Sequence, residues 1–511
     1  MTAWCYRPVS LWPIAACYYI IMKKSIFGIL IMMESLLLAL SAVVSAFYRE
    51  GQWQIYLMTA AAVFVIGLGC KVAGEREKEK RLTRADSFLV VTLSWVVFSI
   101  FGALPYMFIA GMDVHAAFFE SMSGFTTTGA TCISDVDAMP KGLLFWRSLT
   151  HWIGGLGIVV FSFALIPSYD MRSSNVFSAE VTGLGVDKLR PKIGDTARRL
   201  LLIYLFLTAV CALCYWLGPM DTYDSVCHAM STIATGGFST HTASIGYFHS
   251  AYIEYVCCFF MILSGVNFSL FYYASIGRPA TLWRNEETKT FFGIVGFSVL
   301  LFTVLFMFAT SDSCPSELLP HGVEETFRSS LFHVSSIMSS TGFAAQKFDY
   351  VSWGAAFWGP TVTIMAIGAC AGSTAGGIKV LRILIAMKTL FNELVLQLHP
   401  RAVLSVRVNG HAVSEENVRR TLTFVSVYLL LVALGAACHG LMGADVDTCI
   451  GASICTLSNV GPGTGTVGPA CNFASILPAG KWLMSFYMLV GRLEIFTVLF
   501  LFMPHYWKER R

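Results

Sequence analysis

Charged residues are scarce in this chain of 511 residues. Only 13% of the sequence is Asp, Glu, Lys or Arg, whereas 56% is hydrophobic; an ordinary soluble domain carries about 25% charged residues. This shortage excludes a soluble enzyme with a single anchor and indicates a chain that crosses a membrane several times. The net charge of +4 is small, and no basic stretch is interleaved with aromatic residues, so nucleic acid is not an expected partner.

Signatures of catalysis are also missing. The chain has no GxxxxGK[ST] phosphate loop, no HExxH motif, no metal-spaced His/Cys cluster and no hydrolase elbow. We therefore expect neither an enzyme nor an organic cofactor on this chain. Its 15 cysteines lie mostly in apolar stretches. The CxxC pair of Cys211 and Cys214 has no histidine nearby, so we expect packing cysteines rather than disulfides or a metal site.

Ten apolar stretches are each close to the roughly 20 residues that a membrane-spanning helix needs. We predict two N-terminal spans, 26–47 and 53–70, followed by four pairs. The pairs are 87–109 with 143–167, 199–217 with 252–275, 290–309 with 353–387, and 419–440 with 481–503. Between the members of each pair we predict a half-helix of about ten residues that re-enters the membrane. These half-helices are expected to begin near Val114, Thr222, Val323 and Ala444.

A short glycine peptide follows each predicted half-helix. The four copies are FTTTGAT at 125–131, IATGGFS at 233–239, MSSTGFA at 338–344 and LSNVGPG at 457–463. The fifth residue of each copy is a glycine, and successive glycines are 108, 105 and 119 residues apart. Four unequal copies of one unit predict four quarters of a single pore. Glycine suits this role because it permits backbone angles that turn carbonyl oxygens toward an ion.

The centre of each peptide has the form of a potassium filter, in which main-chain oxygens and a threonine hydroxyl replace the hydration shell of the ion. The half-helices would direct their negative dipole ends toward it. The expected potassium-binding residues are Thr127, Thr128, Gly129, Thr235, Gly236, Gly237, Ser340, Thr341, Gly342, Asn459, Val460 and Gly461. Close helix packing through small residues is the alternative, and four matched copies favour the filter. The fourth copy lacks threonine and has Pro462 after its glycine, so we expect an asymmetric, less selective ring.

The second predicted helix of the third pair has four glycines within residues 368–377. Each glycine costs a helix about 1 kcal/mol relative to alanine, so we predict an unwound, movable barrier beneath the filter. Its residues are Gly368, Gly372, Ser373, Thr374, Gly376 and Gly377; a GxxxG packing face is the alternative. Arg492 lies in the middle of the last predicted span, where a charge is costly and indicates a function. A structural pair with Glu494 or with loop carbonyls is its alternative role.

Basic residues are concentrated in alternate loops, which assigns those loops and both termini to the cytoplasm. The basic loops are 71–84, 169–199 and 379–420. The opposite loops contain 13 Asp/Glu against three basic residues, Lys141, Arg328 and Lys347. They could form a mouth that concentrates cations or simply be solvated loops. We interpret Glu34, Arg147, His151 and His228 as packing or interfacial groups rather than ion sites.

The N-terminus leaves two candidate starts. Residues 1–21 are weakly patterned, and Met22 is followed by two lysines and an apolar run, as in a natural membrane-protein start. We therefore treat 1–21 as a non-native extension, with Met1 as the other candidate start. The remaining units are the N-terminal spans at 22–84 and four repeats at 85–198, 199–289, 290–418 and 419–511.

The motifs FTTTGAT, STIATGGFSTH, SSTGF, GSTAGGIK and NVGPG occur in this order between about Met22 and the C-terminus. In this respect the chain resembles the TrkH/KtrB family of potassium uptake proteins, and it is more similar to the TrkH branch because two spans precede the repeats. The resemblance implies a homodimer with one pore per subunit, and a cytosolic TrkA-like nucleotide-binding subunit that gates the pore. It also implies that 368–377 is the gating loop and that Arg492 faces the pore below the filter.

Together these patterns predict a multi-pass protein of the bacterial inner membrane, in contact with lipid, that takes up potassium. Lys379 and Arg382 follow the gating loop and either contact the cytosolic partner or belong to a solvated loop. One rival function is a sodium- or proton-coupled symporter, which would have inverted repeats rather than four repeats of one polarity. The other is a membrane receptor or scaffold that transports nothing.

Overall fold

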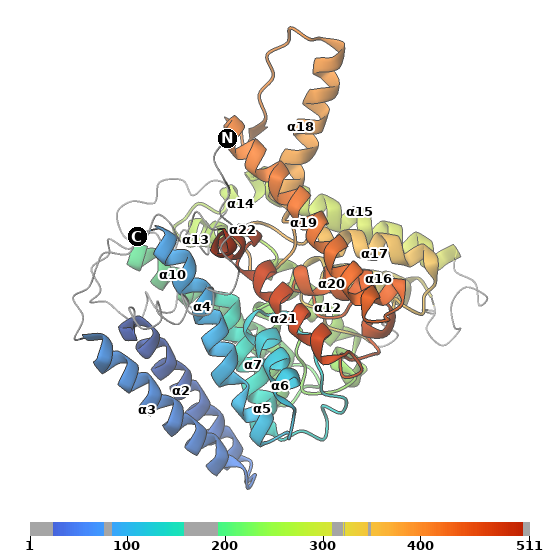
Figure 1. The fold of residues 1–511 in the computed structure, drawn as a ribbon. Coiled ribbons are helices and arrows are strands. Elements are labelled where there is room, and N and C mark those ends of the chain that lie inside the picture. The colour runs from blue at the N-terminus through green and yellow to red at the C-terminus, as the bar shows by residue number, and fades with distance from the viewer. Residues whose placement is uncertain are drawn as a thin grey trace.

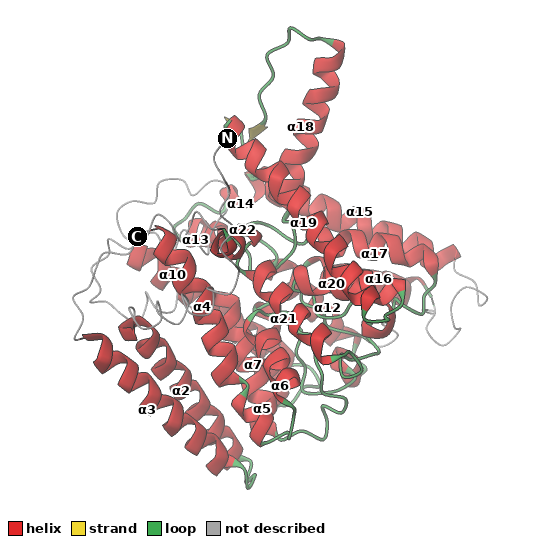
Figure 2. Ribbon diagram, viewed as in Figure 1, coloured by secondary structure: helices red, strands yellow, loops and turns green. Residues whose placement is uncertain are grey.

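Helix makes up nearly all of the regular structure (Figure 2). The computed structural model describes residues 24–75, 84–157, 193–308, 320, 322–345 and 349–503. The one sheet in these ranges is a short antiparallel pair of β1 (Arg407–Val408) and β2 (His411–Ala412). The predicted all-α fold class is therefore confirmed. The predicted extension at 1–21 lies outside the described residues.

Six helices in the described ranges are long and apolar enough to cross a membrane, or eight if two bent pairs each count as one span. The six are α2 (Lys24–Phe47), α3 (Trp53–Glu75), α4 (Arg84–Gly102) continued by α5 (Leu104–Phe108), α10 (Ile193–Trp216), α15 (Glu286–Phe308) and α19 (Glu415–Leu441). The chain is therefore a multi-pass membrane protein. Helices α2 and α3 form a hairpin at one side of the molecule (Figure 1).

Two predicted spans are sharply bent rather than continuous. The span predicted at 252–275 forms α12 (Ala251–Ser264) and α13 (Phe268–Ser275), which meet at 90°. The side chain of Asn267 accepts a hydrogen bond from the amide of Ser269 at 2.8 Å, so α13 begins with its own cap. The span predicted at 481–503 forms α21 (Pro478–Arg492) and α22 (Ile495–Leu499), which continues into η4 (Phe500–Phe502), with a bend of 117°.

The predicted span 353–387 is interrupted at its glycines, as predicted, but it continues beyond its predicted end. Helix α17 (Ala355–Ile367) ends at the first glycine of the predicted barrier, and α18 (Val380–Leu398) begins only after residue 379. Helix α18 then runs beyond the predicted end and projects from the rest of the molecule (Figure 1). Helix α7 (Lys141–Leu156) occupies the first part of the predicted span 143–167; residues 158–167 lie outside the described ranges. The remaining short elements are η2 (Ser244–Phe248), α14 (Ala280–Arg284) and η3 (Gly465–Val467).

Four helices too short to span occupy the places where half-helices are predicted. They are α6 (Val114–Phe125), α11 (Thr222–Ile233), α16 (Val323–Met338) and α20 (Val446–Leu457). Asp221 and Asp445 cap α11 and α20 by accepting hydrogen bonds from the amides of Asp224 at 2.6 Å and Thr448 at 3.1 Å. The C-terminal half of each of the four helices is buried.

The half-helices and the helices that follow them form a closed circle. In addition to contacts within its own repeat, each half-helix packs against the second helix of another repeat: α11 against α7, α16 against α12, α20 against α17 and α6 against α21. The last contact joins the end of the chain to its first repeat. This order positions the four glycine peptides around the centre of the molecule. All cysteines in the described ranges are free, Cys211 and Cys214 among them.

Candidate functional site

Each half-helix is followed, two residues after its end, by a non-glycine residue with a left-handed backbone. These residues are Thr127, Thr235, Ser340 and Asn459, with φ of 52°, 54°, 54° and 53°. Such a conformation costs about 1–3 kcal/mol and persists only where the surroundings impose it. Four nearly equal values at matched positions indicate that the same turn is imposed in every repeat.

The glycine two positions later also has a positive φ in all four repeats. Gly129, Gly237, Gly342 and Gly461 have φ of 82°, 83°, 80° and 93°. We call 127–129, 235–237, 340–342 and 459–461 the ring segments. Here glycine is required by its neighbours as well as by its angles, because each of these glycines touches the main chain of the next segment.

The contacts between ring segments close a circle. A Cβ on Gly129 would lie 2.1 Å from the carbonyl oxygen of Gly236, and one on Gly237 would lie 2.0 Å from that of Thr341. A Cβ on Gly342 would lie 2.0 Å from the carbonyl oxygen of Val460, and one on Gly461 2.7 Å from that of Thr128. Each glycine therefore lies against the middle residue of the next segment, and the fourth segment returns to the first.

The side chains of the ring segments are buried, and several bond to the residue before their segment or to another segment. Thr128 Oγ1 lies 2.8 Å from Thr126 Oγ1, and the matched Thr341 Oγ1 lies 2.7 Å from Ser339 Oγ. Asn459 Nδ2 donates to Thr128 Oγ1 at 2.9 Å and so links the fourth segment to the first. Because the hydroxyls of Thr128 and Thr341 are engaged in these bonds, the main-chain oxygens are the main groups that the ring can offer to a cation.

The ends of the half-helices add a favourable field for a cation. Helices α6, α11, α16 and α20 all end one residue before a ring segment, so their C-terminal carbonyls converge on the ring. A helix C-terminus carries the equivalent of about half a negative charge. Four converging ends therefore favour a positive ion at the ring without any carboxylate.

Residues 368–379 form a non-helical loop between α17 and α18. Gly368, Gly372 and Gly377 have φ of 69°, 75° and 80°. A Cβ on Gly368 would lie 2.3 Å from the carbonyl oxygen of Gly376, so the loop folds back on itself. Ser373 Oγ stays within the loop and donates to the carbonyl oxygen of Cys370 at 2.7 Å. A continuous GxxxG packing helix, the alternative for this stretch, does not form.

The loop lies against the ends of the half-helices and the ring segments. Thr374 Oγ1 donates to the carbonyl oxygen of Ile233 at 3.2 Å and accepts from Thr235 Oγ1 at 3.1 Å. The amide of Gly376 donates to Ser340 Oγ at 2.7 Å. A Cβ on Gly376 would also lie 1.9 Å from the carbonyl oxygen of Ser458. The structure thus brings the predicted loop residues into contact with repeats 2, 3 and 4.

Arg492 completes these contacts from the fourth repeat. It is the last residue of α21, at the bend before α22, rather than the middle of a continuous span. Its Nη1 donates to the carbonyl oxygen of Thr374 at 2.5 Å, and its Nη2 donates to that of Gly154 in α7. The bond to Thr374 is the bond to a loop carbonyl that the alternative role of Arg492 expects, and Glu494, the other group named in that alternative, pairs with Arg382 of α18.

A buried ion pair beside the ring was not assigned a functional role from the sequence. Glu120 of α6 and Arg147 of α7 form it, with 3.0 Å between Oε1 and Nη2 and exposures of 0% and 2%. The sequence does contain a signal for Glu120. It lies nine residues before Gly129, and the residues nine before Gly237 and Gly342 are His228 and His333, so three repeats carry a polar group at this place.

The loops beyond the ring contain a second ionic cluster. His241 Nδ1 lies 2.6 Å from Asp137 Oδ1, and His241 Nε2 lies 3.1 Å from Asp224 Oδ2. Burial alone would lower the pKa of His241, but its hydrogen bonds to Asp224 and Asp137 raise it above the ordinary value. Burial alone would raise the pKa of Asp137, but hydrogen bonds, that from His241 foremost, lower it below its ordinary value. The cluster joins the loop after the first ring segment to the second repeat.

Comparisons with known proteins agree on one family. The TrkH family model, described as "Cation transport protein", matches residues 56–509. The chain is 36% identical over 490 residues to the Trk system potassium uptake protein TrkH of Escherichia coli K12, covering 95% of this chain and 98% of that protein. It is 34% identical over 493 residues to TrkG of the same organism, covering 94% and 97% of the two chains.

A solved structure shows the same fold. The crystal structure of the potassium transporter TrkH from Vibrio parahaemolyticus superposes with a TM-score of 0.84 at 34% sequence identity. The match covers 95% of this chain and 99% of that chain. The likeness therefore extends over the spans, the half-helices and the ring together.

Proposed function

The chain belongs to the TrkH family of cation transport proteins, and on this premise we propose that it takes up potassium through the ring formed by its four repeats. Membership of this family agrees with the prediction that the chain is no enzyme. The observation that carries the proposal is the closed set of contacts in which each ring glycine meets a carbonyl oxygen of the next segment. We assign the protein to the bacterial inner membrane.

The ring segments would hold the ion with their main-chain carbonyl oxygens. Potassium sheds its water where carbonyl oxygens of matched residues surround it, and the four half-helix ends offset its charge. In this proposal, the twelve residues of the ring segments bind the ion. The membrane potential would drive it inward, worth about 2.3 kcal/mol per charge for each 100 mV.

The loop 368–379 and Arg492 would limit the flow of ions. Support comes from the bonds of Thr374 and Gly376 to residues of the ring and the half-helix ends. Further support comes from the fixed positive charge of Arg492, which bonds to the loop at Thr374. A guanidinium always keeps its charge in proteins, so Arg492 would repel potassium until the loop moves.

The projecting helix α18 supports the proposed assembly with other chains. Exposed apolar residues recur along it at helical spacing: Met387, Leu390, Phe391, Leu394 and Leu398. An exposed apolar helix face of this kind marks an interaction site, and we propose that a second copy of this chain buries it. The loop after α18 would meet a cytosolic TrkA-like subunit that releases the gate.

Radioactive rubidium uptake tests the proposed function. Purified protein is reconstituted into liposomes loaded with potassium chloride, and rubidium uptake is followed after external potassium is removed. We expect accumulation that protein-free liposomes do not show and that external potassium inhibits more strongly than sodium. No accumulation would contradict the proposal and favour a receptor or scaffold. Uptake that requires a sodium or proton gradient would instead indicate coupled transport.

A further inference from the structure

The repeats differ in how the chain beyond each ring segment is held. We compare two positions in each repeat: nine residues before the ring glycine and two residues after it. The first position holds Glu120, His228, His333 and Ala452 in repeats 1 to 4. The second holds Thr131, Ser239, Ala344 and Gly463. A polar pair at both positions thus exists only in repeats 1 and 2.

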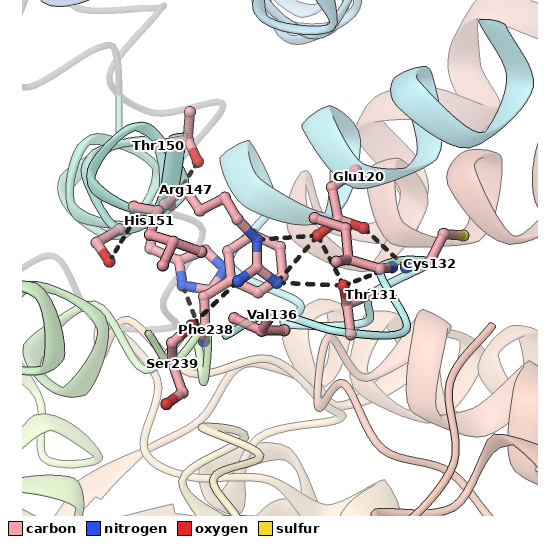
Figure 3. Close-up of polar contacts among 12 residues, drawn as sticks. Glu120, Thr131, Cys132, Val136, Arg147, Thr150, His151, Phe238 and Ser239 are labelled. Carbon is pink, nitrogen blue, oxygen red and sulfur yellow. Dashed lines mark hydrogen bonds and ion pairs between the residues drawn. The ribbon is translucent and has the colours of Figure 1, made fainter. Parts of the chain in front are cut away.

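In repeat 1 the two positions are joined by a charged network (Figure 3). Thr131 Oγ1 donates to Glu120 Oε1 at 2.8 Å, and the amide of Cys132 donates to Glu120 Oε2 at 2.8 Å. Arg147 adds bonds from Nε to Glu120 Oε1 at 3.1 Å and from Nη2 to Thr131 Oγ1 at 3.2 Å. The half-helix and the chain that leaves the ring are thereby fixed to each other.

In repeat 2 the same pair of positions is joined by a neutral bond. His228 Nε2 lies 2.9 Å from Ser239 Oγ, and its Nδ1 lies 2.9 Å from the carbonyl oxygen of Asp224. The two tethers are also connected, because Nη1 of Arg147 donates to the carbonyl oxygen of Ser239 at 3.0 Å. A single guanidinium therefore holds the exits of two ring segments.

Helix α7 also grips the residue after the second ring glycine. The guanidinium of Arg147 lies over the ring of Phe238, 4.0 Å from its centroid, and His151 stacks on the same ring at 4.0 Å. Arg147 and His151 are four residues apart, on one face of α7. Repeat 1 thus clamps the exit of repeat 2 by stacking as well as by hydrogen bonding.

Repeats 3 and 4 lack a pair of polar residues at these two positions. His333 Nε2 bonds instead to Thr361 Oγ1 of α17 at 3.0 Å. The chain after the third ring glycine is held by neutral bonds. Ser336 Oγ donates to the carbonyl oxygen of Phe343 at 2.7 Å, and the amide of Ala344 donates to Ser244 Oγ at 3.2 Å. Ala452 and Gly463 have no polar side chain, and the exit of the fourth segment is held instead by the Tyr350 hydroxyl, which donates to the carbonyl oxygens of Pro462 at 3.1 Å and Gly463 at 2.7 Å. The charged network of Glu120, Thr131 and Arg147, which we call the charged clamp, is therefore confined to one half of the ring.

A charge pair this deeply buried is not an efficient way to gain stability. The free-energy cost of removing both charges from water offsets most of their attraction. The best-attested benefit of a buried ion pair is that it fixes one arrangement of the surrounding structure. All three donor groups of Arg147 described here bond to the half-helix or to the chain leaving the ring. The network therefore fixes the position of the chain that leaves the ring. A fixed position there would keep the main-chain oxygens of the ring from closing around a smaller ion.

We propose that Arg147 and Glu120 are positioning residues that set the preference of the ring for potassium over sodium. They hold ring segments 1 and 2 rigidly at the spacing that suits the larger ion, whereas neutral hydrogen bonds hold the exits of segments 3 and 4. This inference rests on the proposed function. It goes further in assigning selectivity to a clamp outside the ring and to one side of it.

The test compares ion preference in variants that weaken the clamp. Full-length Glu120→Gln and Thr131→Val proteins are reconstituted, and the potassium and sodium concentrations that halve rubidium uptake are measured. We expect the potassium-to-sodium preference to fall about fivefold in each, the change that corresponds to the net worth of one buried hydrogen bond. Thr131→Val keeps both charges and the side-chain shape, so it decides the question if Glu120→Gln is not obtained as a monodisperse protein.

The matched control is Thr361→Val, which removes the hydrogen bond that the repeat 3 histidine makes away from the ring. We expect it to keep the wild-type preference. Unchanged preference in Glu120→Gln and Thr131→Val, with only the yield of folded protein altered, would show that the pair is merely structural. Wild-type uptake in that experiment would leave the proposed function standing; an absence of wild-type uptake would overturn both.

Discussion

Arg492 is joined to Thr374 by a hydrogen bond from its Nη1 to the Thr374 carbonyl oxygen at 2.5 Å, across 118 residues of sequence. The second bond of the guanidinium goes to Gly154 of the first repeat. One cation therefore fastens the loop of repeat 3 to helices of repeats 4 and 1. Because the loop itself bonds to ring segments 2 and 3, the loop and Arg492 together contact all four repeats.

Replacing this cation should open the path. We expect Arg492→Ala to raise rubidium uptake about tenfold, which corresponds to a barrier lower by about 1.4 kcal/mol, because a fixed charge and two anchoring bonds are lost together. Uptake into proteoliposomes measures the effect. Arg420→Ala, which removes an exposed arginine paired with Glu416 on α19, is the control and should behave as wild type. Unchanged or slower uptake in well-folded Arg492→Ala protein would count against the barrier.

The loop can also be released from its other side. Thr374→Val removes the hydroxyl that bonds to Ile233 and Thr235 while keeping the volume of the side chain, so we expect faster rubidium uptake by about threefold to tenfold. Deleting residues 372–376 should raise it further. Ion flux at the wild-type level in a folded deletion variant would show that the loop does not limit conduction.

The His241 cluster should make stability depend on pH. The pKa of His241 is raised above its ordinary 6.5, so its contribution to folding is full below pH 6.5 and is lost as pH rises through the folded pKa. The pKa of Asp137 is lowered below 3.8, so its contribution is lost only in strong acid. His228 and the stacked ring of Tyr247 also face this site.

We therefore expect His241→Gln to lower the melting temperature more at pH 5.5 than at pH 8.5. Thermal unfolding of detergent-solubilised protein at the two pH values is the measurement. His411→Gln provides the control, since His411 is exposed in β2. An equal loss of stability at both pH values would indicate that the charge on His241 contributes nothing.

Much of the ring could be predicted from sequence because its constraints are local. The positive φ of Gly129 and the main-chain atom that touches it both require a residue without a side chain, so a glycine recurs at the matched place in all four copies. The break at 368–377 was predictable for a similar reason, since glycine density weakens a helix whatever surrounds it. Hydropathy likewise indicates the apolar spans, which need only length and composition.

The rest depends on partners that are distant in the chain. Arg147 meets Ser239 across 92 residues, and no spacing rule connects α7 to the exit of the next repeat. Loop carbonyls are one predicted alternative for Arg492, but its bond to the carbonyl oxygen of Gly154 in the first repeat leaves no mark in the sequence. The bend between α12 and α13 was missed although Asn267 offers a cap, because the flanking apolar residues continue the pattern of a span.

The central claim is that main-chain oxygens of four glycine-containing segments form the ion path, and alanine at two of the glycines tests it most directly. Rubidium uptake is compared for wild type, Gly129→Ala, Gly237→Ala and the control Gly296→Ala in α15, where an added Cβ meets nothing within 4 Å. We predict that both ring variants lose rubidium uptake or potassium preference by at least about tenfold, because the left-handed backbone and the touching carbonyl resist a methyl group. The control should retain both. Wild-type uptake and preference in folded Gly129→Ala and Gly237→Ala proteins would contradict the account.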